Sequence, residues 1–225
     1  MTHRLPEIEL DRLAICEGLC ERNLVRQMVR LGLVGPIQAM SISELGQGNG
    51  TDALKKYLVA LDALTNIESL QAIGVLLDNE DDHVSAFNRT VRSIEWANMN
   101  LMRNAVPVPT SAFVRFTGGD WSFHSYFAPG GTEPGSFEFL VLQVFYDLYP
   151  QKMHCVDALL ECSNANVGAG WSAIKLAKAK VCVALALLDE QNPTRALSLT
   201  IRERQDLIPA SHPAFLGIRV FLDSI

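Results

Sequence analysis

The sequence LQAIGVLL at residues 70–77 runs directly into the acidic stretch DNEDD at residues 78–82. A short and almost wholly apolar run is typical of a central strand in a parallel sheet, because such a strand is buried on both faces. The acidic residues then follow at the carboxyl end of the strand. A helix is predicted next, from about residue 84 to residue 96, so this part of the chain is predicted to form a strand, a turn and a helix.

The same order of elements is predicted nearer the N-terminus. Residues 12–16 form an apolar run that ends at Glu17 and Gly18, and apolar residues recur at helical spacing from Cys20 onwards. Another strand is predicted at residues 36–42. Strands that alternate with helices imply right-handed crossovers and a mostly parallel sheet, whose ligands bind beyond the carboxyl ends of the strands.

The rest of the chain supplies two more strands and several helices. The strands are predicted at residues 112–116 and 122–128. Helices with an apolar stripe are predicted at residues 137–149, 156–163, 173–188 and 213–225. We therefore expect an α/β fold with a mostly parallel, Rossmann-like sheet flanked by helices. We expect one domain over residues 1–225, with a core at about 10–130 and a C-terminal helical extension at about 135–225.

Composition is that of an ordinary globular protein. The chain has 225 residues, of which 48% are hydrophobic, and no apolar run approaches the roughly 20 residues that cross a bilayer. The N-terminal residues lack the apolar core of a secretory signal, so we expect a cytoplasmic protein without membrane contact. Five cysteines at wide spacings suit a reducing compartment and do not fit a structural zinc site.

The charge argues against one class of function. A formal net charge of −6 is unlike that of proteins that coat nucleic acid through a broad basic surface. It does not exclude an enzyme that acts on nucleic acid, because the carboxylates of a metal site carry negative charge that bound cations neutralise.

Two acidic groups are candidates for such a metal site. Glu17 and Glu21 flank the predicted turn after the first strand, and the run 78–82 follows the buried strand. Both groups are expected at the same sheet edge, and carboxylate oxygens are the ligands that Mg²⁺ prefers. Each group also has a simpler interpretation, since Glu21 could stabilise a helix N-terminus and residues 78–82 could cap the next helix.

The order of these motifs resembles a known family. A strand that ends in Glu-Gly, an intervening helix and strand, and a buried strand that ends in Asp-x-acid are similar to the Toprim domain of topoisomerases, primases, recombination nucleases and OLD-family nucleases. The sequence EGLCE at residues 17–21 is most similar to the OLD-type and related small bacterial Toprim proteins.

Further resemblance lies downstream. Pro129, Gly135 and the pair Phe137 and Glu138 resemble a Pro and a later Gly-x-Leu-Glu motif in a family of small stand-alone Toprim-like proteins. A lysine-led helix at Lys178 and the sequence HPAFL at residues 212–216 are similar to two further features of that family.

The resemblance implies roles for the acidic residues. Asp78 and Glu80 would hold Mg²⁺, or Mn²⁺ in its place, and Glu17 would ligate metal or exchange a proton as a catalytic residue. Glu21 and Glu138 would complete a second metal site.

Two positions leave alternatives open. The usual Asp-x-Asp of the family is Asp78, Asn79 and Glu80 here, so Asp81 or Asp82 could replace the second aspartate as a metal ligand. Lys178 would act as a catalytic cation that offsets charge on a transferring phosphate. Its alternative is a solvated lysine on an amphipathic helix.

The function implied by the resemblance is Mg²⁺-dependent, nuclease-like processing of nucleic acid or another phosphoester, in DNA repair or phage defence. Its partners would be nucleic acid and a protein such as an ATPase, and a homo-oligomer is compatible with the fold. The first alternative is a catalytically inactive Toprim-like binding or regulatory subunit. The second is a small-molecule binder that uses the same crevice at the strand ends.

Overall fold

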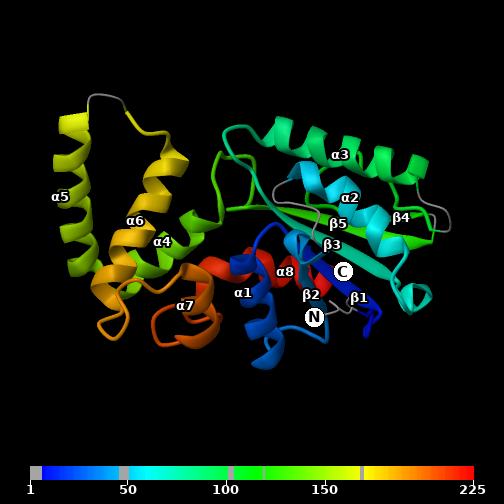
Figure 1. The fold of residues 1–225 in the computed structure, drawn as a ribbon, viewed down its shortest axis with the longest axis horizontal. Helices are drawn as coiled ribbons and strands as arrows, with labels where there is room; N and C mark the ends of the chain where they lie inside the picture. The colour runs from blue at the N-terminus through cyan, green and yellow to red at the C-terminus, as the bar shows by residue number, and fades with distance from the viewer. Residues whose placement is uncertain (1–6, 46–50, 101–103, 119, 168–169) are drawn as a thin grey trace, which may run out of the picture.

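The computed structural model describes residues 7–45, 51–100, 104–118, 120–167 and 170–225 (Figure 1). The strands are β1 (Arg12–Cys16), β2 (Gln38–Ser41), β3 (Ala72–Asp78), β4 (Phe116–Gly118) and β5 (Trp121–Ala128). The α-helices are α1 (Leu19–Arg30), α2 (Thr51–Asp62), α3 (His83–Asn100), α4 (Phe137–Leu148), α5 (Pro150–Val167), α6 (Ala173–Leu188), α7 (Leu197–Glu203) and α8 (Leu216–Ser224). Short 3-10 turns occupy Ile42–Leu45, Ile67–Ser69 and Pro213–Phe215.

Within the described residues the strands form one sheet in the order β2-β1-β3-β5-β4. Neighbouring strands from β2 to β5 are parallel, and β4 adds an antiparallel edge. The predicted α/β fold with a mostly parallel, Rossmann-like sheet is therefore confirmed. The register pairs Cys16 of β1 with Leu76 of β3, and Asp78 of β3 with Ala128 of β5, so these strands end at a common edge.

Helices cover both faces of the sheet (Figure 1). The helices α2 and α3 lie on one face, α1 and α8 lie on the other, and α4, α5 and α6 stand together beyond the carboxyl end of β5. One cluster of buried side chains extends from the α1 and α8 face of the sheet into α4 to α7, and a second lies under α2 and α3. Among the described residues no helix has the length and apolar character needed to cross a membrane.

The alternation of side chains along β3 explains why this strand lies at the centre. Ile73, Val75 and Leu77 pack under α2 and α3, while Leu76 faces the opposite cluster. At Gly74 an added Cβ would lie 2.2 Å from Ile225 Cδ1, so the glycine lets the C-terminal helix approach the strand.

One predicted strand is wrong, and one observed helix was not predicted. The strand predicted at residues 112–116 is wrong, because residues 112–113 form a turn and β4 begins only at Phe116. Phe113 has a left-handed φ of 61°, and its ring stacks on His83 at 5.5 Å between centroids. The short helix α7 was not predicted, since seven residues carry too little helical periodicity to be recognised.

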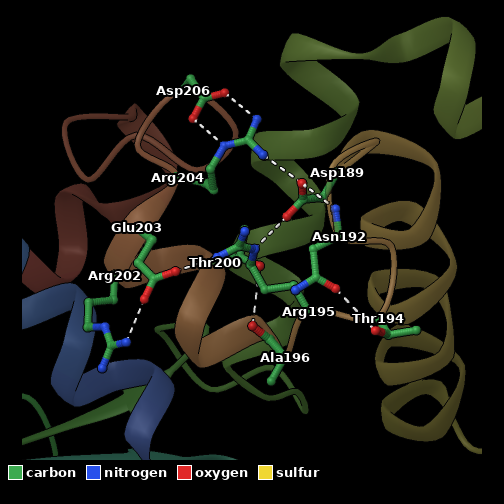
Figure 2. Close-up of polar contacts among 10 residues, drawn as sticks. All are labelled: Asp189, Asn192, Thr194, Arg195, Ala196, Thr200, Arg202, Glu203, Arg204 and Asp206. Atoms are coloured by element: carbon green, nitrogen blue, oxygen red, sulfur yellow. Dashed lines mark hydrogen bonds and ion pairs between the residues drawn. The ribbon is translucent and has the colours of Figure 1, made fainter.

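A buried aspartate joins α6 to α7 (Figure 2). Asp189 has no exposed side-chain surface and lies between two arginines, with 2.6 Å from its carboxylate to Arg195 Nε and 2.6 Å to Arg204 Nη1. Burial by itself raises the pKa of Asp189, but the hydrogen bond from Arg195 and the positive charges of both arginines outweigh it, so the pKa is lowered. The carboxylate therefore stays ionised and holds the segment after α6 in place.

The same segment positions α1. The Asn23 side chain of α1 donates a hydrogen bond to the Ser198 carbonyl of α7 at 2.7 Å, and Gln27 donates to the Arg202 carbonyl. The helix that follows Glu17 is thus anchored to the C-terminal part of the chain.

We predict that Asp189→Asn lowers the melting temperature by several degrees, because both arginines would lose their buried counter-charge. The folded-state pKa of Asp189 is lowered, so its stabilising contribution is present above the unfolded value of about 3.9 and is lost as the pH falls through the lower folded value. Differential scanning calorimetry should therefore show the full drop in the melting temperature of Asp189→Asn, relative to the wild type, between about pH 5 and pH 8. Below about pH 4 the drop should be smaller.

The matched control is Asp206→Asn. Asp206 also pairs with Arg204, but its side chain is 62% exposed, and exposed pairs contribute little. An equal drop in melting temperature for the two variants would contradict the central role of Asp189.

Candidate functional site

The ends of β1 and β3 are joined through the side chain of Glu17. The Glu17 N–H donates to the Leu76 carbonyl at 2.9 Å, and the Asp78 N–H donates to Glu17 Oε2 at 3.0 Å. The glutamate side chain thus continues the hydrogen-bonding between the two strands past the end of β1. The structure brings together the two residues on which the predicted site depends.

Glu21 lies on the first turn of α1, directly beside this pair. Its Oε2 accepts a hydrogen bond from the Gly18 N–H at 3.1 Å, so it caps the helix as the simpler interpretation expected. Its side chain is also almost fully buried, at 7% exposure. The Glu21 side chain therefore caps the helix and also lies beside the carboxylates at the strand ends.

The start of α4 contributes the third side of the site. The Phe137 N–H donates to Asp78 Oδ1 at 2.8 Å, and Ser136 Oγ donates to Glu138 Oε2 at 2.7 Å. Gly135 allows this approach, because a Cβ there would lie 2.7 Å from Pro129 Cδ. The motif at residues 129–138 is thus built against the end of β3.

The acidic side chains act on one another electrostatically. Burial raises the pKa of Asp78 well above its usual value, and the charges of Glu17, Glu21 and Glu138 add to the rise. Burial likewise raises the pKa of Glu21 to about 7, with further contributions from Glu17 and Glu138. We call Glu17, Glu21, Asp78 and Glu138 the acidic cluster.

Lys178 lies at the exposed side of the cluster, on α6. Burial raises the pKa of Glu17, and the positive charge of Lys178 partly opposes that rise. The pKa of the Cys20 thiol is raised by burial and by its acidic neighbours, and Lys178 again opposes the rise. Lys178 is therefore close enough to exert its charge on the cluster while remaining open to solvent.

Glu80 and Asp82 bind other partners, although the charge of Glu80 still adds to the rise in the pKa of Glu17. Glu80 has a left-handed φ of 54°, exchanges backbone hydrogen bonds with Gly135 at 2.8 Å, and pairs through its carboxylate with Arg89 of α3. Asp82 caps α3, since its side chain accepts hydrogen bonds from the Val84 and Ser85 N–H groups at 3.1 Å.

The structural roles of two residues beside the acidic cluster were not predicted from the sequence. Asn79 is fully buried, and its amide donates to the Gly131 and Glu133 carbonyls at 3.1 and 2.9 Å, which holds the loop before α4. Arg89, about two turns after the start of α3, forms an ion pair with Glu80. No sequence pattern indicates the roles of Asn79 and Arg89, because their partners are distant in sequence or lie on another element.

The chemistry of the cluster suits a hard divalent cation, because every member supplies carboxylate oxygens. Through the part of the chain that the structure describes, no three His, Cys, Asp or Glu side chains are grouped so that they could hold a metal ion as placed. Oxygens of Glu17, Glu21 and Asp78 are instead engaged by backbone N–H groups. The donor types fit a cation, and the carboxylates would have to converge around it.

No family model, curated protein or solved structure matches the chain. The interpretation of the site therefore rests on the geometry above and on the resemblance of its motifs.

We predict that Glu21→Gln stabilises the metal-free protein at pH 8 and has little effect at pH 5. A carboxyl group whose folded-state pKa is raised binds its proton more tightly in the folded state, so ionisation destabilises the fold. The destabilisation caused by ionising Glu21 is absent at pH values below its pKa in the unfolded chain and fully present above about pH 7. There it lowers the free energy of unfolding by about 3 kcal/mol.

Urea unfolding in a chelating buffer measures this difference. The control is Glu95→Gln, on the exposed face of α3, which should change stability little at either pH. The electrostatic account of the cluster is wrong if Glu21→Gln has the same effect at both pH values.

Proposed function

We propose that the protein is a Mg²⁺-dependent, Toprim-type enzyme that processes nucleic acid or another phosphoester at the acidic cluster, with Mn²⁺ able to replace Mg²⁺. The observation that carries this proposal is the geometry at the carboxyl edge of the sheet, where the Asp78 N–H donates to Glu17 and Asp78 accepts from the start of α4. Burial raises the pKa of Asp78 and of Glu21, and their acidic neighbours add to the rise. Burying several negative charges together destabilises a fold unless they are protonated or meet a cation. A divalent cation relieves that repulsion.

When bound at such a site, a divalent cation polarises a phosphodiester and lowers the pKa of a coordinated water. Asp78 lies at the centre of the cluster, between Glu17 and the start of α4, and would hold the cation together with Glu17. Glu21 and Glu138 face the same region and would hold a second cation or orient the first. All these donors are carboxylates, whose oxygens hard cations prefer.

Two residues have properties suited to the reaction itself. Burial raises the pKa of Glu17, which favours a carboxyl group that can hold and release a proton. Lys178 is exposed, yet its charge reaches Glu17, so it is placed to meet a negatively charged phosphate that enters from solvent. We propose Glu17 as the group that exchanges a proton and Lys178 as the cation that offsets phosphate charge.

The biological setting is a proposal from the resemblance. Small Toprim proteins point to DNA repair or phage defence, with nucleic acid as substrate and a partner such as an ATPase, in a cytoplasmic protein. Fold-level analogy supports the process and not the chemistry of individual residues.

A second candidate function has its own support. The side chain of Glu80 is paired with Arg89, and Asp82 caps α3, so two of the three candidates for the second acidic ligand after Asp78 are engaged elsewhere. This arrangement favours a Toprim-like subunit that binds or regulates without catalysis. The two candidates differ in whether the protein cleaves a phosphoester once a cation is bound.

We predict that Mg²⁺ or Mn²⁺ binds the wild-type protein and that Asp78→Asn weakens binding by at least about tenfold. Removal of a group that only hydrogen-bonds to a metal ligand typically lowers metal affinity about 10–100-fold. Removal of the charge of a ligand itself should lower the affinity by at least as much. Titration calorimetry measures the affinity, and incubation with plasmid and single-stranded DNA measures cleavage.

Asp82→Asn is the matched control, because asparagine also caps helices well and the residue lies outside the acidic cluster. It should bind the cation as the wild type does. Binding and cleavage that both require Asp78 support the enzyme, whereas binding without cleavage supports the regulatory subunit. A wild type that takes up neither cation contradicts both metal-dependent proposals.

A further inference from the structure

A second candidate site lies away from the acidic cluster, in a hollow between α2 and α3. Lys55 of α2 and Arg89, Arg92, Ser93 and Trp96 of α3 line this hollow, which has a volume of about 240 Å³. We call it the basic hollow. A second hollow of about 240 Å³ shares Arg89 and Arg92 and continues along α3 through Asn88 to Ser85.

The basic hollow carries a concentration of positive charge in a protein whose formal net charge is −6. None of the described residues that line it is a carboxylate. Among the described residues Arg89 is the one cation of the hollow with an ion-pair partner, Glu80, whereas Lys55 and Arg92 form no ion pair there. Uncompensated cations around a concave surface favour an anionic ligand.

Arg89 also has an unused hydrogen-bond donor. Its Nε is buried and has no hydrogen-bond partner among the described residues. A buried donor left unpaired costs free energy, and the Arg89 side chain would have to shift for a ligand oxygen to reach this atom and remove that cost. Guanidinium groups match the oxygens of a phosphate in both shape and charge, so Arg89 and Arg92 suit this anion in particular.

Trp96 adds an aromatic surface at the other end of the hollow. Its side chain is 38% exposed, and Lys55 Nζ lies 5.6 Å from its ring centroid. Arg89 and Trp96 are seven residues apart on α3, which corresponds to about 10 Å along the helix axis. This span is comparable to the extended length of a nucleoside monophosphate, with the base at the indole and the phosphate at the arginines.

We propose that the basic hollow binds a nucleotide, with the phosphate between Arg89 and Arg92 and the base stacked on Trp96. Stacking on an aromatic ring tolerates any base, because every base has a flat π face. The same chemistry would accept a free nucleotide or the terminal nucleotide of a strand. The site shares no residue with the acidic cluster and needs no cation bound there, although the positive charge of Arg89 acts on Glu17.

The test is titration calorimetry in a chelating buffer with AMP, adenosine, inorganic phosphate and a 5′-phosphorylated oligothymidylate. We expect AMP to bind at least about tenfold more tightly than adenosine or phosphate, because only AMP engages both ends of the hollow. Tighter binding of AMP than of the oligonucleotide identifies a free nucleotide as the ligand, and the reverse identifies a strand end. Both results support the site.

Arg92→Gln and Trp96→Leu should each weaken AMP binding about tenfold, and Trp96→Phe should retain most of it because a stacking surface remains. The matched controls are Lys175→Gln and Trp171→Leu, since Lys175 Nζ lies 5.2 Å from the Trp171 ring centroid in a comparable pair outside the hollow. Both controls should bind AMP as the wild type does. Circular dichroism verifies that each variant is folded.

Asp78→Asn separates this site from the proposed function, because it should bind AMP normally while losing the cation. The proposal is overturned if the wild type does not bind AMP at millimolar concentration, or if the controls lose as much affinity as the hollow variants. It is also overturned if phosphate binds as tightly as AMP and Trp96→Leu has no effect, because the hollow would then be an anion site without base recognition.

Discussion

The parallel pairing of β1, β3 and β5 is the constraint on which the rest of the structure depends. Parallel strands in one sheet end at the same edge, so the residues after Cys16, Asp78 and Ala128 must lie close together although they come from distant parts of the chain. The apolar character of β3 keeps it central, because a strand buried on both faces needs neighbours and helices on both sides.

Placing carboxylates at that edge creates an electrostatic cost that backbone groups partly offset. Asp78 accepts from the first residue of α4, and Glu21 accepts from the residue before α1, so two helix starts donate N–H groups to the cluster. These donors do not cancel the effects of burial and of the neighbouring charges, since the pKa of Asp78 and the pKa of Glu21 remain raised. The result is a buried cluster whose charge depends on pH and on any cation that enters.

The C-terminal helices complete this arrangement from the other side. Asp189 holds Arg195 and Arg204 at the end of α6, which fixes the segment leading to α7, and α7 accepts hydrogen bonds from α1. Lys178 is therefore carried on a helix that is tied to the same element as Glu21. The position of the Lys178 side chain near the acidic cluster thus depends on packing between helices that lie far from the sheet edge.

The sequence by itself determined the fold class, the strands β1, β3 and β5, and the proximity of Glu17 to Asp78. Each follows from a local pattern, because apolar runs and helical periodicity are read within a short window. The helix from Ala173 to Leu188 was predicted at its observed bounds for the same reason.

Only the tertiary structure decided which acidic residues after β3 join the cluster and which do not. Glu80 turns to Arg89 and Asp82 caps α3, and these choices depend on a left-handed backbone at Glu80 and on the packing of α3, which no spacing encodes. The basic hollow has the same origin, because it combines Lys55 of one helix with a face of another. Contacts between elements distant in sequence are set by packing, and a single sequence carries no direct record of them.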